Sequence, residues 1–153
     1  MVCKAFVSLL LLSLWLAGFK YGYGSNATMV EHLLWPLSHV NIWHLAGNLW
    51  VLWYIPGQLR ILESYAIAVL CSFLPVLSLW GIGYTAGFSG VLCASVGIKW
   101  GVWCASCKGK QPYWTFCKRV LPFIAISVVI PHVNWCIHLY CLLAGLAYGA
   151  ERR

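Results

Sequence analysis

The chain has 153 residues, of which 62% are hydrophobic and only 8% are charged. Soluble domains carry about 25% charged residues, so this composition excludes an ordinary soluble domain and is typical of a multi-span membrane protein. The net charge of +7 does not indicate a nucleic-acid partner, because the basic residues fall between apolar runs instead of forming a stripe. The length predicts a single domain over residues 1–153.

Apolar runs separated by turn signals predict an all-α membrane protein with six spans. The first run, residues 2–19, also resembles a secretory signal peptide, but no clear Ala-x-Ala site follows it, and we expect it to be retained. A polar, Gly-rich loop is expected over residues 20–38, and a basic loop over residues 107–119. The other predicted spans are residues 39–55, 61–79, 88–104, 120–134 and 135–150, of which the last two are short for a bilayer.

The basic residues test this division into spans. With six spans, both termini face the same side of the membrane, and nine of the ten basic residues fall on that side: Lys4, Arg60, Lys99, Lys108, Lys110, Lys118, Arg119, Arg152 and Arg153. Only Lys20 falls on the other side. The positive-inside rule therefore predicts that both termini are cytoplasmic.

Two features bear on the kind of membrane. A short chain without extra soluble domains favours a bacterial inner membrane. Asn26-Ala27-Thr28 is a glycosylation sequon on the expected outer side, and it has meaning only in a eukaryotic secretory membrane.

Several polar side chains lie at matching depth in the outer halves of three separate spans. His44 and Asn48 share one helix face because they are four residues apart, and His39 precedes them. Ser89 lies near the start of the fourth span, and His138 lies near the start of the sixth. Polar groups in a bilayer are costly and usually point inward toward partners.

Two stripes of small residues predict which helices meet. Gly90, Ala94, Gly97 and Gly101 form one stripe in the fourth span, and Cys141, Gly145 and Gly149 form another in the sixth. Small residues let helices approach closely in lipid. If the stripes face each other, Ser89 and His138 come within hydrogen-bonding distance, about 2.6–3.2 Å.

Other catalytic or metal sites are less well supported. The chain contains no Asp, which excludes a Ser-His-Asp triad. A Ser-Lys pair with Lys99 is poor, because ten residues of helix separate it from Ser89 by about 15 Å. Cys104-x-x-Cys107 with Cys117 is an incomplete zinc motif, and most other cysteines lie in apolar runs. We therefore expect no metal and no cofactor.

Three blocks of the sequence resemble the rhomboid family of intramembrane serine proteases. "HVNIWHLAGNLWVLW" (residues 39–53) looks like the family's second-helix signature of two histidines before an asparagine. "GFSGVLCASVG" (residues 87–97) looks like its Gly-x-Ser-Gly block, and "HLYCLLAGL" (residues 138–146) looks like its catalytic-histidine helix. The blocks occur in the family's order, on a six-span core.

The resemblance implies roles for particular residues. Ser89 would be the nucleophile and His138 its general base, while Asn48, His44 and the backbone N–H of Ser89 would form the oxyanion hole. His39, Gly87 and Gly90 would support the site. The implied reaction needs no cofactor, and the implied partners are transmembrane protein substrates in a lipid bilayer; the oligomeric state is open.

The chain departs from the family pattern at several positions. Cys141 replaces a glycine three residues after the histidine, and Cys93 replaces an aromatic residue that supports the histidine in some members. Arg60 stands where an acidic residue is expected, with Glu63 nearby but out of register. These departures bear on efficiency and substrate handling more than on the chemistry.

Rims of a hydrated cavity are expected at residues 81–87 and 131–134, and the short fifth span is expected to move aside for a substrate helix. Two other functions remain open: a catalytically inactive rhomboid-like protein that binds transmembrane clients, and a small transporter or channel that uses the histidines as a proton path.

Overall fold

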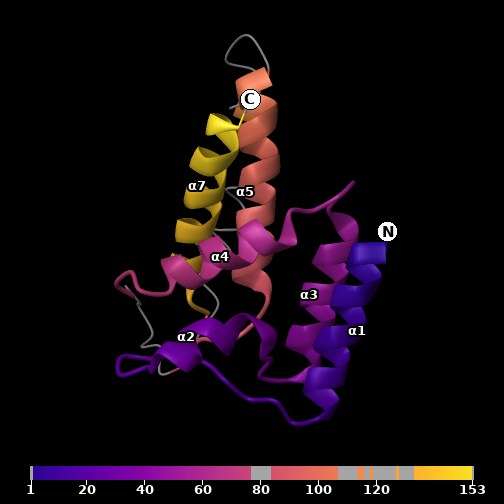
Figure 1. The fold of residues 1–153 in the computed structure, drawn as a ribbon, viewed down its shortest axis with the longest axis vertical. Helices are drawn as coiled ribbons and strands as arrows, with labels where there is room; N and C mark the ends of the chain where they lie inside the picture. The colour runs from indigo at the N-terminus through magenta and orange to yellow at the C-terminus, as the bar shows by residue number, and fades with distance from the viewer. Residues whose placement is uncertain are drawn as a thin grey trace.

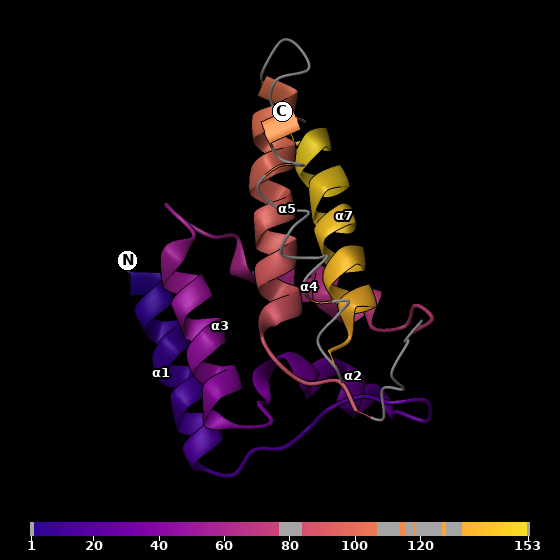
Figure 2. The same ribbon diagram turned by 180° about the vertical axis from the view of Figure 1, so that it is seen from behind.

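The computed structural model describes residues 2–76, 84–106, 114–115, 118, 127 and 133–152. Within these residues the fold is all-helical (Figures 1 and 2), and the only extended pairing is an isolated antiparallel bridge between Tyr23 and Thr85. The helices are α1 (Val2–Leu16), α2 (Met29–Leu34), the 3-10 helix η1 (Trp35–Leu37), α3 (Ile42–Tyr54), α4 (Ile61–Cys71), α5 (Ser89–Ser106) and α7 (Trp135–Glu151). No helix in these described ranges combines the length and the hydropathy needed to cross a bilayer.

The helices form two pairs joined by shorter elements. The α5 and α7 helices run side by side in the same direction, whereas α1 and α3 run antiparallel (Figures 1 and 2). The α4 helix crosses the α5–α7 pair, and α2 lies near the end where α5 and α7 begin. The starts of α5 and α7 therefore lie at the same end of the molecule.

The loop predicted over residues 20–38 is wrong in part, because it contains α2 and η1. Thr28 and Glu31 form a capping box at the start of α2: the Thr28 backbone N–H and hydroxyl donate to the Glu31 carboxylate at 2.7 and 2.8 Å. These bonds hold the pKa of Glu31 below its usual range. Pro36 lies at the start of η1, where a missing N–H costs nothing.

The helix ends correct the predicted boundaries. The first helix stops at Leu16, not at residue 19, and is followed by Gly18 with φ +72°. The second begins at Ile42 and not at residue 39, because the Asn41 side chain caps it by accepting the His44 N–H at 2.9 Å. The third ends at Cys71, and residues 77–79 of its predicted range lie outside the described residues.

The predicted fourth and sixth spans are close to α5 and α7, each of which extends further at its C-terminal end. Most of the predicted fifth span, residues 120–134, lies outside the described residues, as do Cys107, Cys117 and residues 81–83 and 131–132.

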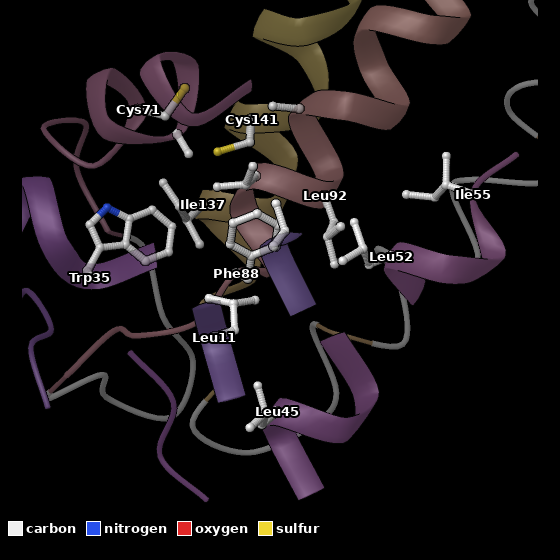
Figure 3. Packing of buried hydrophobic residues seen from close by; sticks show 14 of the residues in the cluster. Leu11, Trp35, Leu45, Leu52, Ile55, Cys71, Phe88, Leu92, Ile137 and Cys141 are labelled. Atoms are coloured by element: carbon white, nitrogen blue, oxygen red, sulfur yellow. The ribbon is translucent and has the colours of Figure 1, made fainter. Parts of the chain in front are cut away.

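The core lies between the two helix pairs (Figure 3). Phe88 is 2% exposed and lies at its centre, with Leu11 of α1, Leu52 of α3 and Ile137 of α7 around it. Trp35 of η1 is also buried in this cluster. The core thus fixes the segment just before Ser89 against three helices and η1.

Four basic residues gather around residues 55–63. Lys4 donates to the Ile55 carbonyl oxygen, and Lys99 donates to that of Gln58. Arg60 and Arg152 pair with Glu63 at 3.3 and 3.9 Å. Lys20 lies beyond the other end of α1.

Candidate active site

Ser89 and His138 are in direct contact. The Ser89 Oγ lies 2.8 Å from the His138 Nε2, within the range expected for a nucleophile and its base. Ser89 is the first residue of α5, and His138 lies in the first turn of α7. Because the two helices run in parallel, both side chains fall at the same height, as the sequence predicts.

The small-residue stripes hold α5 and α7 together. A Cβ added at Gly97 or Gly101 would overlap the backbone of α7, and one added at Gly145 or Gly149 would overlap the carbonyl of Ala94 or Ile98. Two helices approach this closely only where side chains are absent. The predicted contact between the two stripes is therefore confirmed.

Gly87 shapes the turn that leads into Ser89. Its φ of +126° is a conformation that residues with a side chain rarely adopt. Its N–H donates to the Trp35 carbonyl oxygen at 3.0 Å, which ties the turn to η1. A Cβ added here would lie 2.7 Å from the His44 Nε2 and 3.5 Å from the Asn48 Nδ2. The missing side chain thus brings α3 against the turn.

Asn48 and His44 face this turn from α3. Asn48 is 6% exposed, and its Nδ2 has no hydrogen-bond partner among the residues that the structure describes. A buried amide donor without a partner is costly and therefore informative. The Asn48 amide N–H is therefore free to donate a hydrogen bond, and it faces Gly87, which lies two residues before Ser89.

His39 also reaches the turn, although it precedes α3. Its Nε2 lies 3.5 Å from the Phe88 backbone N, and its ring centroid lies 5.3 Å from that of His44. His39 is 2% exposed. The structure therefore brings His39, His44 and Asn48 together around the residues that precede Ser89.

Gly90 supports the site from the other side. A Cβ added there would lie 2.6 Å from the Trp35 Cη2 and 3.4 Å from the Cys141 Sγ. The Trp35 ring therefore packs directly on the first turn of α5. Sequence reasoning missed Trp35, because it lies within the predicted loop over residues 20–38 and no motif contains it.

A buried polar cluster at the start of α7 was not predicted from the sequence. The Asn134 Oδ1 accepts the Ile137 N–H at 3.2 Å, which caps α7 one turn before His138. The Asn134 Nδ2 donates to the Tyr23 hydroxyl at 3.2 Å and to the Thr85 Oγ1 at 2.9 Å. The Asn-x-x-x-His spacing was the available signal for this cap; nothing in the sequence signalled Tyr23 or Thr85.

The bridge between Tyr23 and Thr85 completes this cluster. Their backbones exchange hydrogen bonds of 3.0 and 2.8 Å. Burial raises the pKa of the Tyr23 phenol, so it stays protonated and acts as a neutral partner. Because Thr85 lies four residues before Ser89 and Asn134 four before His138, one cluster sets the positions of both helix starts.

The departures from the family pattern have structural partners. Cys141 is fully buried between α7, Gly90 and the core, and Cys93 is partly buried on α5. Glu63 pairs with both Arg60 and Arg152, which links the start of α4 to the end of α7. Lys99 lies ten residues after Ser89 on α5, and its ammonium group contacts the carbonyl oxygen of Gln58.

Comparison with known protein families agrees with this arrangement. The model of the Rhomboid domain family matches residues 26–152. Comparison with curated proteins and with solved structures gives no match. The matched region contains all five polar side chains of the site, from His39 to His138, and most of the chain. This protein therefore belongs to the rhomboid family.

Proposed function

We propose that this protein is an intramembrane serine endopeptidase that cleaves transmembrane segments by a Ser89–His138 dyad. Rhomboid proteins are membrane proteins and in general serine proteases, so the family match supports a membrane location and this class of chemistry. The observation that carries the proposal is the 2.8 Å contact between the Ser89 Oγ and the His138 Nε2.

In the first half-reaction, the neutral His138 imidazole takes the Ser89 proton as the Oγ attacks the scissile carbonyl carbon. The resulting imidazolium gives this proton to the leaving amide nitrogen, and the C–N bond breaks. A water molecule then attacks the acyl ester while His138 accepts its proton. The new carboxyl product leaves when the proton returns to the Ser89 Oγ.

Charge on the carbonyl oxygen needs donors during both steps. The buried Asn48 Nδ2 lacks a partner among the described residues, and His44 lies beside it against Gly87. The start of α5 adds backbone N–H groups that have no intrahelical acceptor. Donors held in place before the reaction need no reorganisation as charge develops.

The proposed substrates are transmembrane helices that unwind locally, because a hydrogen-bonded helix does not expose its carbonyl groups. We place the protein in a bacterial inner membrane with both termini cytoplasmic, and the charge asymmetry of the sequence supports this orientation.

The test uses the purified full chain in liposomes with a generic transmembrane substrate and, separately, a fluorophosphonate probe. We expect cleavage and labelling by the wild type, and loss of both in Ser89→Ala and His138→Ala. Ser106→Ala is the matched control, since this exposed serine lies at the other end of α5. A wild type that neither cleaves nor labels supports the inactive, client-binding alternative instead.

A further inference from the structure

Two lysines meet at the segment that follows α3, away from the proposed active site. The buried Lys4 ammonium of α1 donates to the Ile55 carbonyl oxygen. The Lys99 ammonium of α5 lies 3.5 Å from the carbonyl oxygen of Gln58. Both ammonium groups therefore lie against the short segment Ile55–Gln58. An ammonium has three donors, so neither group is saturated by one carbonyl.

No acidic side chain neutralises this pair. The chain has only three acidic side chains. Glu63 pairs with Arg60 and Arg152, and the Glu31 carboxylate accepts from Thr28. Within the described part of the chain, no salt bridge joins Glu151 or any other carboxylate to Lys4 or Lys99. A pair of partly desolvated like charges is unfavourable unless an anion joins it.

A cavity of about 610 Å³ lies between the first residues of α1 and the segment that follows α3, and Lys4 forms part of its wall. Figures 1 and 2 show the start of α1 beside the end of α3. Its wall includes Lys4, Gly57 and Gln58 on the polar side, and Val2 and Phe6 on the apolar side. Lys99 neighbours this wall without lining it: a Cβ at Gly57 would lie 3.3 Å from the Lys99 Nζ.

We infer that this cavity binds the phosphate diester head group of an anionic phospholipid, with Lys4 and Lys99 as its cationic partners. Basic pockets between helices on the cytoplasmic side of a membrane suit such head groups. A lipid fits better than free phosphate because Val2 and Phe6 beside the cavity are 86% and 65% exposed and offer an apolar surface to acyl chains. The site would anchor α1 to α3 and α5.

The test is native mass spectrometry of the full chain released from nanodiscs that contain equal amounts of phosphatidylglycerol and phosphatidylcholine. We expect the wild type to retain phosphatidylglycerol selectively. Lys4→Gln and Lys99→Gln should each reduce its retention about fivefold. Glutamine keeps an N–H donor for the backbone carbonyl while removing the charge. Lys20→Gln, a matched loss of one exposed lysine at the other end of α1, should retain the lipid fully.

Each outcome of this experiment decides the inference. Equal retention of the two lipids by the wild type, or the same loss in Lys20→Gln, overturns it. Displacement of the lipid by inorganic phosphate as readily as by a soluble short-chain phosphatidylglycerol reassigns the cavity to free phosphate. If Lys4→Gln does not fold, Lys99→Gln alone decides the result. The readout is lipid retention, so it is independent of peptidase activity and is repeated in Ser89→Ala.

Discussion

Gly87 and His44 lie in such close contact that no side chain fits between them: a Cβ at Gly87 would be 2.7 Å from the His44 Nε2. The contact joins the turn before the proposed nucleophile to the helix that carries the proposed oxyanion donors. Position 87 requires glycine for two reasons: a side chain would overlap His44, and the backbone φ is +126°.

Gly87→Ala should therefore lower peptidase activity strongly. The methyl group forces His44 away from the turn and strains the backbone two residues before Ser89. We expect at least about a tenfold fall in cleavage rate, measured with the liposome substrate. Gly47→Ala is the control, because a Cβ at Gly47 meets nothing within 4 Å. Equal activity of the two variants would contradict the role given to the turn.

Asn48→Ala tests the proposed oxyanion donor. Loss of one such donor typically lowers kcat about 100- to 1,000-fold. The Asn48 Nδ2 has no hydrogen-bond partner among the described residues, so removing this amide group loses no hydrogen bond of the Nδ2 there. The melting temperature should therefore change little. Cleavage rate and thermal unfolding are measured together, with Asn26→Ala as an exposed control. A large loss of stability with unchanged kcat would make Asn48 a packing residue.

His138→Gln tests the general base with minimal change of volume. Glutamine can donate a hydrogen bond to Ser89 but cannot accept its proton near neutral pH. We expect cleavage to fall by about 100- to 10,000-fold, the usual contribution of a positioned base. Fluorophosphonate labelling should fall with it, because the Ser89 oxygen is then no longer activated. Labelling at the wild-type rate would show that another group activates Ser89.

Gly145→Val should destabilise the fold by separating α5 from α7. The added side chain overlaps the Ala94 carbonyl, which belongs to a helix backbone and cannot rotate away. Overpacking of this kind costs about 1–3 kcal/mol. Thermal unfolding in detergent measures the loss, again beside Gly47→Ala. A variant as stable as the wild type would mean that the helices do not pack through this stripe.

Asn134→Ala should reduce activity through the positions of α5 and α7. It removes the cap of α7, worth about 1 kcal/mol, and leaves the Tyr23 and Thr85 hydroxyls without their shared donor. We expect kcat to fall while KM stays unchanged. Asn134→Asp should restore part of the activity, because the aspartate keeps an acceptor for the Ile137 N–H. Kinetics that match the wild type after correction for folded fraction would refute the positioning role.

The sequence alone determined the local structure of the helices and the pairing of two of them. Helix propensity and apolar runs act over a few residues, so α5 and α7 fall close to their predicted ranges. The small-residue stripes also encode an interface, since only small side chains allow close helix contact. Once these stripes meet, the contact between Ser89 and His138 follows from helix geometry.

Only the tertiary structure decided how the loops support the site. Trp35 packs on Gly90, and Asn134 bonds to Tyr23, which is 111 positions away in the chain. No periodic pattern encodes such contacts, because they depend on the path of irregular segments and not on local repeats. The α2 helix was missed for a different reason: its capping box is a local signal, but the helix has only six residues and lies within a polar, Gly-rich segment. Most helices could be predicted from the sequence because helix formation depends on neighbouring residues. The contacts that align these helices form only when segments distant in the chain fold together.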